Sequence, residues 1–264
     1  MVLKGTRVCW LERLPLPAGV CERGLPQAPI ALGDLLGDWL LERGYAPAQV
    51  WAVLPPDACS WHVLPWRPGM DRDCEGEAVD VLIEPLQAAS MAFAIEISVS
   101  RNLLMGWVAV CQQAEIQLVG LTAAVQSQWN GLLAALGPER WLSCEHGFLV
   151  QLGWSRSWLL TYKSTHPYQQ QQLPGLADPD GLTEALHPLM ASNPQSTFWA
   201  VVDGCWQLDD VEEMARLQRA LPMPLMPVTT LPAAFRGVSW LLWGLVAPHV
   251  CRIQASHPAQ IAAS

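Results

Sequence analysis

Charge is scarce in this sequence, and lysine most of all. Of the 264 residues, 15% are charged, and the only lysines are Lys4 and Lys163. An ordinary globular chain carries about 25% charged residues. The formal net charge is −9, and no run of basic residues is present. A chain without a basic face is a poor ligand for nucleic acid and for anionic lipid, so we expect neither as a partner.

Long hydrophobic segments are also missing. The longest uncharged apolar stretch, 238–250, is broken by Gly244 and Pro248. It is shorter than the roughly 20 residues that a membrane-spanning helix needs. No apolar segment follows the first residues, so no signal peptide is predicted. We therefore expect no direct insertion into a membrane.

The sequence lacks the spacings of metal sites and of common catalytic motifs. The eight cysteines are scattered, no two are spaced C-x-x-C, and no cysteine–histidine cluster has zinc-site spacing. Ser155 stands in Gly-Trp-Ser-Arg-Ser, which differs from the Gly-x-Ser-x-Gly turn of hydrolases. We expect free thiols, as in a reducing compartment, no metal and no catalytic residue.

The sequence is instead rich in apolar periodicity, since 51% of its residues are hydrophobic. Apolar residues three or four positions apart predict helices, and short β-type runs bounded by Pro or Gly predict strands. Helices are expected at 30–43, 103–115, 125–136, 180–190, 208–221 and 235–246. Strands are expected at 6–14, 50–54, 60–64, 92–99, 117–121, 148–152, 157–163 and 198–202, and 169–172 is either a polar strand or a loop edge. This alternation predicts a layered α/β architecture.

Two glycine turns are candidate ligand contacts. Gly153, with Trp154 and Ser155, joins two expected strands, and the backbone N–H groups of such a turn can bind an anion. Gly204, followed by Cys205, ends a buried-type strand and would let a ligand approach the backbone. The alternative for both is an ordinary turn without a ligand.

The order of the expected elements resembles the actin, sugar-kinase and Hsp70 superfold. Its second half has a hairpin with a glycine turn, a helix, a strand-Gly-helix junction and a late helix of small residues. Within that superfold the chain is similar to the PilM-like proteins of type IV pilus assembly, relatives of FtsA and of the cytoplasmic domain of GspL. The segments that carry the resemblance are 14–20 with the helix 32–39, VWAVLP at 50–55, WHVLP at 61–65, the block 92–136 with QLVGL at 117–121, FWAVVDG at 198–204 and WGLVA at 243–247.

This resemblance implies a two-lobed α/β fold, the actin-like or ribonuclease H-like fold, truncated at the N-terminal strand. The first lobe would span 1–137 and include an inserted small subdomain at about 70–137. The second lobe would span 138–250, and 251–264 would be a frayed tail.

The sequence departs from this family in the parts that hold ATP and Mg²⁺. The opening strand lacks the acidic residue and the Gly/Ser turn of the first phosphate loop. Gln151 stands before Gly153 where the family carries an aspartate, and a neutral amide cannot supply the charge that hydrated magnesium needs. Trp206 would narrow the floor of the nucleoside loop. We therefore expect no cofactor, with ATP binding weak or lost.

The resemblance implies an assembly scaffold rather than an enzyme. It would lie in the cytoplasm and reach the inner membrane through a partner, by docking the N-terminal cytoplasmic peptide of a bitopic, PilN-like pilus assembly protein. A motor ATPase is a possible further partner. Trp51, Trp61 and Trp66 would line the peptide groove, since tryptophan is a favoured interface anchor; the alternative is that they pack in the core.

Two other functions stay open. The chain could be an ATP-binding switch or enzyme of the same superfold, with Gly153, Trp154, Ser155, Gly204 and Cys205 contacting the nucleotide. It could also be an unrelated α/β binding module, if the structure lacks actin-type lobes. The sequence does not choose between motility, DNA uptake and secretion.

Overall fold

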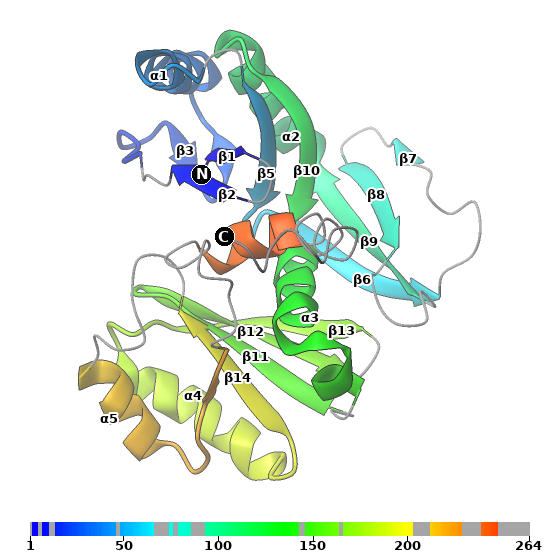
Figure 1. Cartoon of the computed structure of the whole chain (residues 1–264), viewed down its shortest axis with the longest axis vertical. Helices are drawn as coiled ribbons and strands as arrows, with labels where there is room; N and C mark the ends of the chain where they lie inside the picture. Colours follow the sequence, from blue (N-terminus) through cyan, green and yellow to red (C-terminus); the bar gives the residue numbers. More distant parts are fainter. Residues whose placement is uncertain are drawn as a thin grey trace, which may run out of the picture. The chain divides into compact units, whose positions relative to one another are not determined.

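The computed structural model describes residues 2–4, 7–10, 14–45, 48–65, 74–75, 79–85, 93–142, 146–163, 166–202, 212–228 and 239–247 (Figure 1). The chain divides into two compact units. Unit 1 comprises Met1–Leu11, Gln87–Ser90 and Ser127–Ser264, and unit 2 comprises Glu12–Leu86 and Met91–Gln126. The sequence-based lobe boundary after 137 stays a prediction.

A five-stranded sheet organises unit 1, in the order β13-β12-β11-β14-β15. The strands are β11 (His146–Leu152), β12 (Arg156–Lys163), β13 (Pro167–Pro174), β14 (Thr197–Val202) and β15 (Met226–Pro227). The first three in sequence form an antiparallel meander, while β14 pairs parallel with β11 and β15 pairs parallel with β14. A parallel pair needs a crossover, and α4 (Pro179–Ser192) lies in the connection from β13 to β14.

Helices cover both faces of this sheet (Figure 1). Alternate residues of a strand point to opposite faces, so β11 sends Phe148, Val150 and Leu152 to one side. These side chains share a core with Leu182 and Leu186 of α4 and with apolar residues at and beyond α5 (Glu212–Ala220). Asp178 caps α4 by accepting a hydrogen bond from the N–H of Gly181 at 3.0 Å. Burying this apolar set is the main driving force for folding the unit.

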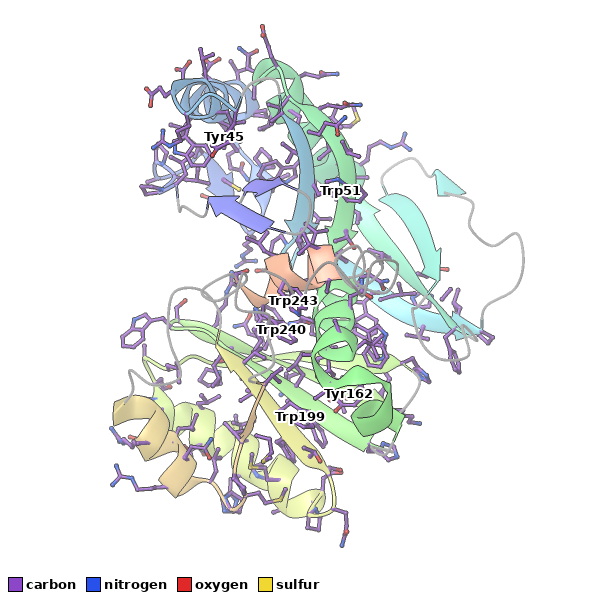
Figure 2. All side chains as sticks on the ribbon, in the orientation of Figure 1. Tyr45, Trp51, Tyr162, Trp199, Trp240 and Trp243 are labelled. Carbon is purple, nitrogen blue, oxygen red and sulfur yellow. The ribbon has the colours of Figure 1, made fainter. Side chains whose placement is uncertain are left out.

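The opposite face of the sheet packs against α3 (Ala124–Leu142) and a final helix over 240–247. The ring of Trp129 on α3 meets Tyr162 of β12 edge-on, with 5.8 Å between centroids. Figure 2 shows Trp240 and Trp243 on the final helix and Tyr162 and Trp199 on the sheet.

Helix α3 and the final helix approach each other closely. The Ser127 hydroxyl donates a hydrogen bond to the carbonyl of Leu241, and a side chain at Gly244 would collide with the Ser127 backbone. A second glycine, Gly131, lies beneath the rings of Trp240 and Trp243. Small residues on both helices therefore set the distance between them.

Unit 2 contains two larger sheets and two helices. Strands β5 (Gln49–Leu54) and β10 (Gln117–Ala123) pair parallel. A four-stranded antiparallel sheet has the order β6-β9-β8-β7, from β6 (Cys59–Pro65), β7 (Cys74–Glu75), β8 (Val79–Pro85) and β9 (Phe93–Ser100). Helices α1 (Pro29–Glu42) and α2 (Arg101–Gln113) pack together, with Gly33 of α1 against Gln113 and Gly37 against Ala114.

Two short hairpins complete the described elements. Strands β3 (Cys21–Glu22) and β4 (Leu25–Pro26) form one in unit 2, and the Trp107 indole of α2 donates a 2.8 Å hydrogen bond to the Gly24 carbonyl in its turn. Strands β1 (Val2–Lys4) and β2 (Arg7–Trp10) form the other in unit 1. The helix expected at 125–136, with its end before Gly137 and Pro138, is predicted too short, since α3 continues to Leu142. A proline removes one helical hydrogen bond but does not always end the helix.

The contact between Gly244 and Ser127 can be tested by adding one methyl group. We expect Gly244→Ala to lower the free energy of unfolding by about 1–3 kcal/mol, because the methyl group meets backbone atoms that have nowhere to move. Chemical denaturation measures this change.

The matched control is Gly106→Ala in α2, where an added Cβ would sit at an ordinary 3.4 Å from Pro26. We expect that variant to be more stable by about 0.5–1 kcal/mol, as alanine for glycine within a helix usually is. Equal effects at both positions would contradict the packing described here.

Candidate functional site

A chain of three glutamine amides, two of them buried, lies beneath the hairpin turn of unit 1. The Gln128 Nε2 of α3 donates to the Gln151 Oε1 of β11 at 2.6 Å, and the Gln170 Nε2 of β13 donates to the Gln128 Oε1 at 2.6 Å. Gln128 is 0% and Gln151 2% exposed. Three elements are thus joined through neutral amides, and the oxygen of Gln151 faces an N–H donor of the protein.

The turn that follows Gln151 is held from two sides. The Gly153 N–H donates to the Ser157 hydroxyl at 3.3 Å. The carbonyls of Gly153 and Trp154 accept hydrogen bonds from the N–H groups of Leu176 and Ala177, each at 2.9 Å. Gly175 lies so close to residues 154–156 that a side chain there would collide with their backbone. The turn is therefore rigid, and the N–H of Gly153 already has an acceptor within the protein.

The side chains at the tip of the turn face solvent. Trp154 is 48% exposed, and Ser155 and Arg156 are exposed as well. The hydroxyl of Ser155 and the guanidinium of Arg156 are the groups that an anion would meet first. Contact of Gly153, Trp154 and Ser155 with a phosphate stays a prediction, as does contact with Gly204 and Cys205, which lie outside the described residues.

The tryptophans predicted to bind a peptide occupy different sheets of unit 2. Trp51 lies on β5, Trp61 lies on β6 opposite Ile97 of β9, and Trp66 is outside the described residues. Trp61 is half-buried, whereas Trp51 is 49% exposed. Of the two described, Trp51 is therefore the more accessible to a partner, and the role of all three stays a prediction.

Figure 2 shows Trp51 on β5, and its indole ring packs over a glycine of β10. Its register partner on β10 is Gly120, and a side chain at Gly120 would collide with the indole ring. The pairing shifts between Leu118 and Gly120, so Val119 is an extra residue and is 41% exposed. A hydrogen bond from Gln49 Nε2 to Gln117 Oε1 at 3.1 Å lies at the start of the same strands. We call Gln49, Trp51, Gln117 and Val119 the Trp51 patch; it carries no charge.

The remaining reactive groups among the described residues include three thiols and one histidine–carboxylate pair, in which His62 Nε2 lies 2.9 Å from Glu96 Oε1. The thiols of Cys21, Cys59 and Cys111 are free. Burial, helped by the nearby Asp57 carboxylate, raises the pKa of Cys59 to about 11, so this thiol is not a nucleophile at neutral pH. Within the described ranges no group of three or more His, Cys, Asp or Glu side chains is placed to hold a metal ion. A helix long and apolar enough to cross a membrane is likewise not found among them.

Comparison with known proteins supports the fold that the sequence predicts. No protein-family model and no curated protein matches the sequence. Among solved structures, the chain is similar to one from the "PilM-PilN type IV pilus biogenesis complex", with a TM-score of 0.61, 14% identity and coverage of 90% of this chain and 89% of that chain.

Two further similarities are weaker. The ethanolamine utilization protein EutJ of Carboxydothermus hydrogenoformans gives a TM-score of 0.44, 12% identity and coverage of 88% and 77%. The cytoplasmic domain of EpsL, an inner-membrane component of the Vibrio cholerae type II secretion system, gives 0.42, 12% identity and coverage of 83% and 80%. These two carry no weight for the fold. The similarity with a TM-score of 0.61 does, and it confirms the predicted actin-like α/β fold class.

Neither Gln128 nor Gly120 was singled out from the sequence. Gln128 stands in a polar stretch of a predicted helix, and only the fold places it beneath Gln151. In the sequence Gly120 is an ordinary strand residue, and only the register of β10 with β5 places it against the ring of Trp51. For Trp51 and Gly120, the alternation of side chains along the two strands is the one sequence signal that could have indicated the pairing.

The amide chain predicts a coupling between two buried positions. We expect Gln128→Leu to lower the free energy of unfolding by about 1–3 kcal/mol, because the buried amide of Gln151 loses its hydrogen bond from Gln128 and the amide of Gln170 loses its acceptor on Gln128. The double variant Gln128→Leu and Gln151→Leu should lose less than the sum of the two single variants. Denaturation curves of the three variants measure the coupling.

Gln117→Leu is the control, since Gln117 forms an exposed amide pair with Gln49. Its stability should stay within about 0.5 kcal/mol of the parent chain. Strict additivity of the two buried substitutions would show that the amides are not coupled.

Proposed function

We propose that this chain is an actin-like scaffold of a type IV pilus or related assembly, located in the cytoplasm beside the inner membrane. It docks the cytoplasmic peptide of a bitopic, PilN-like membrane protein and uses nucleotide weakly or not at all. The observation that carries the proposal is the structural similarity over 90% of this chain to a protein of the PilM–PilN complex. We also propose a motor ATPase as a possible second partner.

The buried amide chain supports the loss of nucleotide use. A magnesium ion bound to phosphate is coordinated or ordered by carboxylate oxygens. At the position where the related proteins carry an aspartate, Gln151 is neutral, 2% exposed and hydrogen-bonded to Gln128. An oxygen already paired with an internal amide is a weak competitor for a hydrated cation. The chain would then hold its partner by surface contact alone.

The Trp51 patch is the surface that we assign to the peptide. Trp51 and Val119 offer exposed apolar area on two neighbouring strands, and the exposed Gln49–Gln117 amide pair lies at the start of the same strands. An aromatic anchor next to polar groups that can hydrogen-bond a backbone is a common arrangement in peptide recognition. Gly120 fixes the indole in place, so little side-chain entropy remains to be lost when a peptide binds.

Calorimetric titration with a matched pair of tryptophan variants tests the docking surface. The probe is a synthetic peptide with the N-terminal cytoplasmic sequence of a bitopic, PilN-like protein from the same genome. We expect Trp51→Ala to weaken binding by at least about tenfold, as loss of an interface anchor does. Trp51→Phe keeps a ring over Gly120 and should retain most of the affinity.

Trp154→Ala is the control, because Trp154 is 48% exposed, almost the same as Trp51 at 49%, but lies in the hairpin turn of unit 1. Its affinity for the peptide should equal that of the parent chain. Equal losses in Trp51→Ala and Trp154→Ala, or no binding by the parent chain, would contradict the assignment.

The rival function is an ATP-binding switch of the same fold. It predicts that Mg·ATP raises the melting temperature, since a ligand that binds only the folded state stabilises it. It also predicts that Gly153→Val abolishes this shift. Our proposal expects that Mg·ATP changes the melting temperature of neither the parent chain nor Gly153→Val. A clear increase in the parent chain that disappears in Gly153→Val would establish the rival.

A further inference from the structure

Strand β13 forms the outer edge of the unit 1 sheet. Among the described residues β12 is its one strand partner, so the other side of β13 has no strand beside it. Pro167 and Pro174 mark the two ends of the strand, and the pairing with β12 shifts next to Pro167. Proline has no N–H to donate, so edge pairing is confined to the six residues 168–173 between them.

This edge carries none of the charges that usually keep sheet edges apart. Natural edge strands are commonly protected by lysine or another charged side chain. Residues 168–173 read Tyr-Gln-Gln-Gln-Gln-Leu, and Gln169, Gln171 and Gln172 are exposed. Tyr168 is 43% exposed, and the Nζ of Lys163, on the neighbouring strand, lies 5.5 Å from the centre of that tyrosine ring. The edge is therefore neutral and open.

The strand is also held firmly from behind. Gln170 points to the α3 face, where its amide donates to Gln128. Leu173 points to the α4 face and is buried in that core. Because side chains alternate, Gln169 and Gln171 share the α4 side with Leu173 but remain exposed. An uncharged edge strand whose side chains are anchored on both faces of the sheet is a template for another strand.

We propose that β13 pairs antiparallel with β13 of a second copy of this chain, across a twofold axis centred on Gln170 or Gln171. A twofold contact must be self-complementary, and glutamine is, because its amide both donates and accepts. With the centre on Gln170, Gln169 faces Gln171 of the second copy; with the centre on Gln171, Gln171 faces itself.

Charge favours a second copy at this edge. Two chains that each carry −9 repel one another, so contact between copies is least unfavourable where the surface is neutral. The edge from 168 to 173 meets that condition. A basic or acidic partner would find no opposite charge there, whereas an identical run of amides finds matching donors and acceptors. The resulting dimer joins two five-stranded sheets and does not depend on nucleotide or on the docked peptide.

Charge-swap variants analysed by sedimentation velocity over a range of concentrations test this dimer. One variant carries Gln169→Lys and Gln171→Lys, and the other carries Gln169→Glu and Gln171→Glu. For either possible centre, each variant alone places like charges opposite each other, and we expect its dimer to be at least about tenfold weaker. An equal mixture of the two places lysine opposite glutamate and should form mixed dimers.

His187→Lys on the exposed side of α4 is the control for added positive charge, and its dimerisation should match that of the parent chain. If mixed dimers form when the lysine and glutamate variants are combined, both variants are folded, and the loss of dimers in each alone is due to charge repulsion. A parent chain that stays monomeric at every concentration overturns the proposal. So does a dimer that survives both charged variants, since the contact would then lie elsewhere, and so does a mixture that remains monomeric.

Discussion

The hydrogen bond between the buried amides of Gln128 and Gln151 fixes how α3 lies on the sheet of unit 1. An unpaired amide at that depth costs about 1–3 kcal/mol, so rotations of α3 that separate the two side chains are disfavoured. The neighbouring residue Ser127 bonds the carbonyl of Leu241, and Gly244 rests against its backbone. The final helix is therefore held against α3 by these contacts, and the amide bond between Gln128 and Gln151 helps to hold α3 on the sheet.

The same pair constrains the chemistry that this face of the sheet can support. A buried carboxylate needs a cation or several donors to offset its desolvation, whereas a buried amide needs only another amide. Gln151 has such a partner at 2.6 Å, and Gln128 continues the chain to Gln170. The polar groups at this position stabilise the fold itself.

Periodicity in the sequence predicts most of the fold because each strand and helix buries one side. The helix expected at 30–43 is α1 (Pro29–Glu42), and the hairpin expected around Gly153 is β11 and β12. The glutamine run, left open between strand and loop, is part of β13. The end of α3 could not be predicted, because Gly137 and Pro138 are local stop signals that the fold overrides. The seat of Trp51 on Gly120 could not be predicted either, because it depends on a shift in register between two strands that are distant in sequence.

The glutamine run illustrates how one residue type acquires two roles from strand geometry alone. Four consecutive glutamines have the same chemistry, yet alternation turns Gln170 towards Gln128 and Gln171 towards solvent. A charged residue in place of Gln170 would lie half-buried against α3, whereas a fully apolar run would remove the hydrogen bond between Gln170 and Gln128 and expose apolar area at an edge. Glutamine satisfies both sides, because its amide can be buried when paired and hydrated when exposed. The neutrality of the edge thus follows from what the interior behind it requires, and the prolines at its ends, rather than charges, limit how far another strand can pair along it.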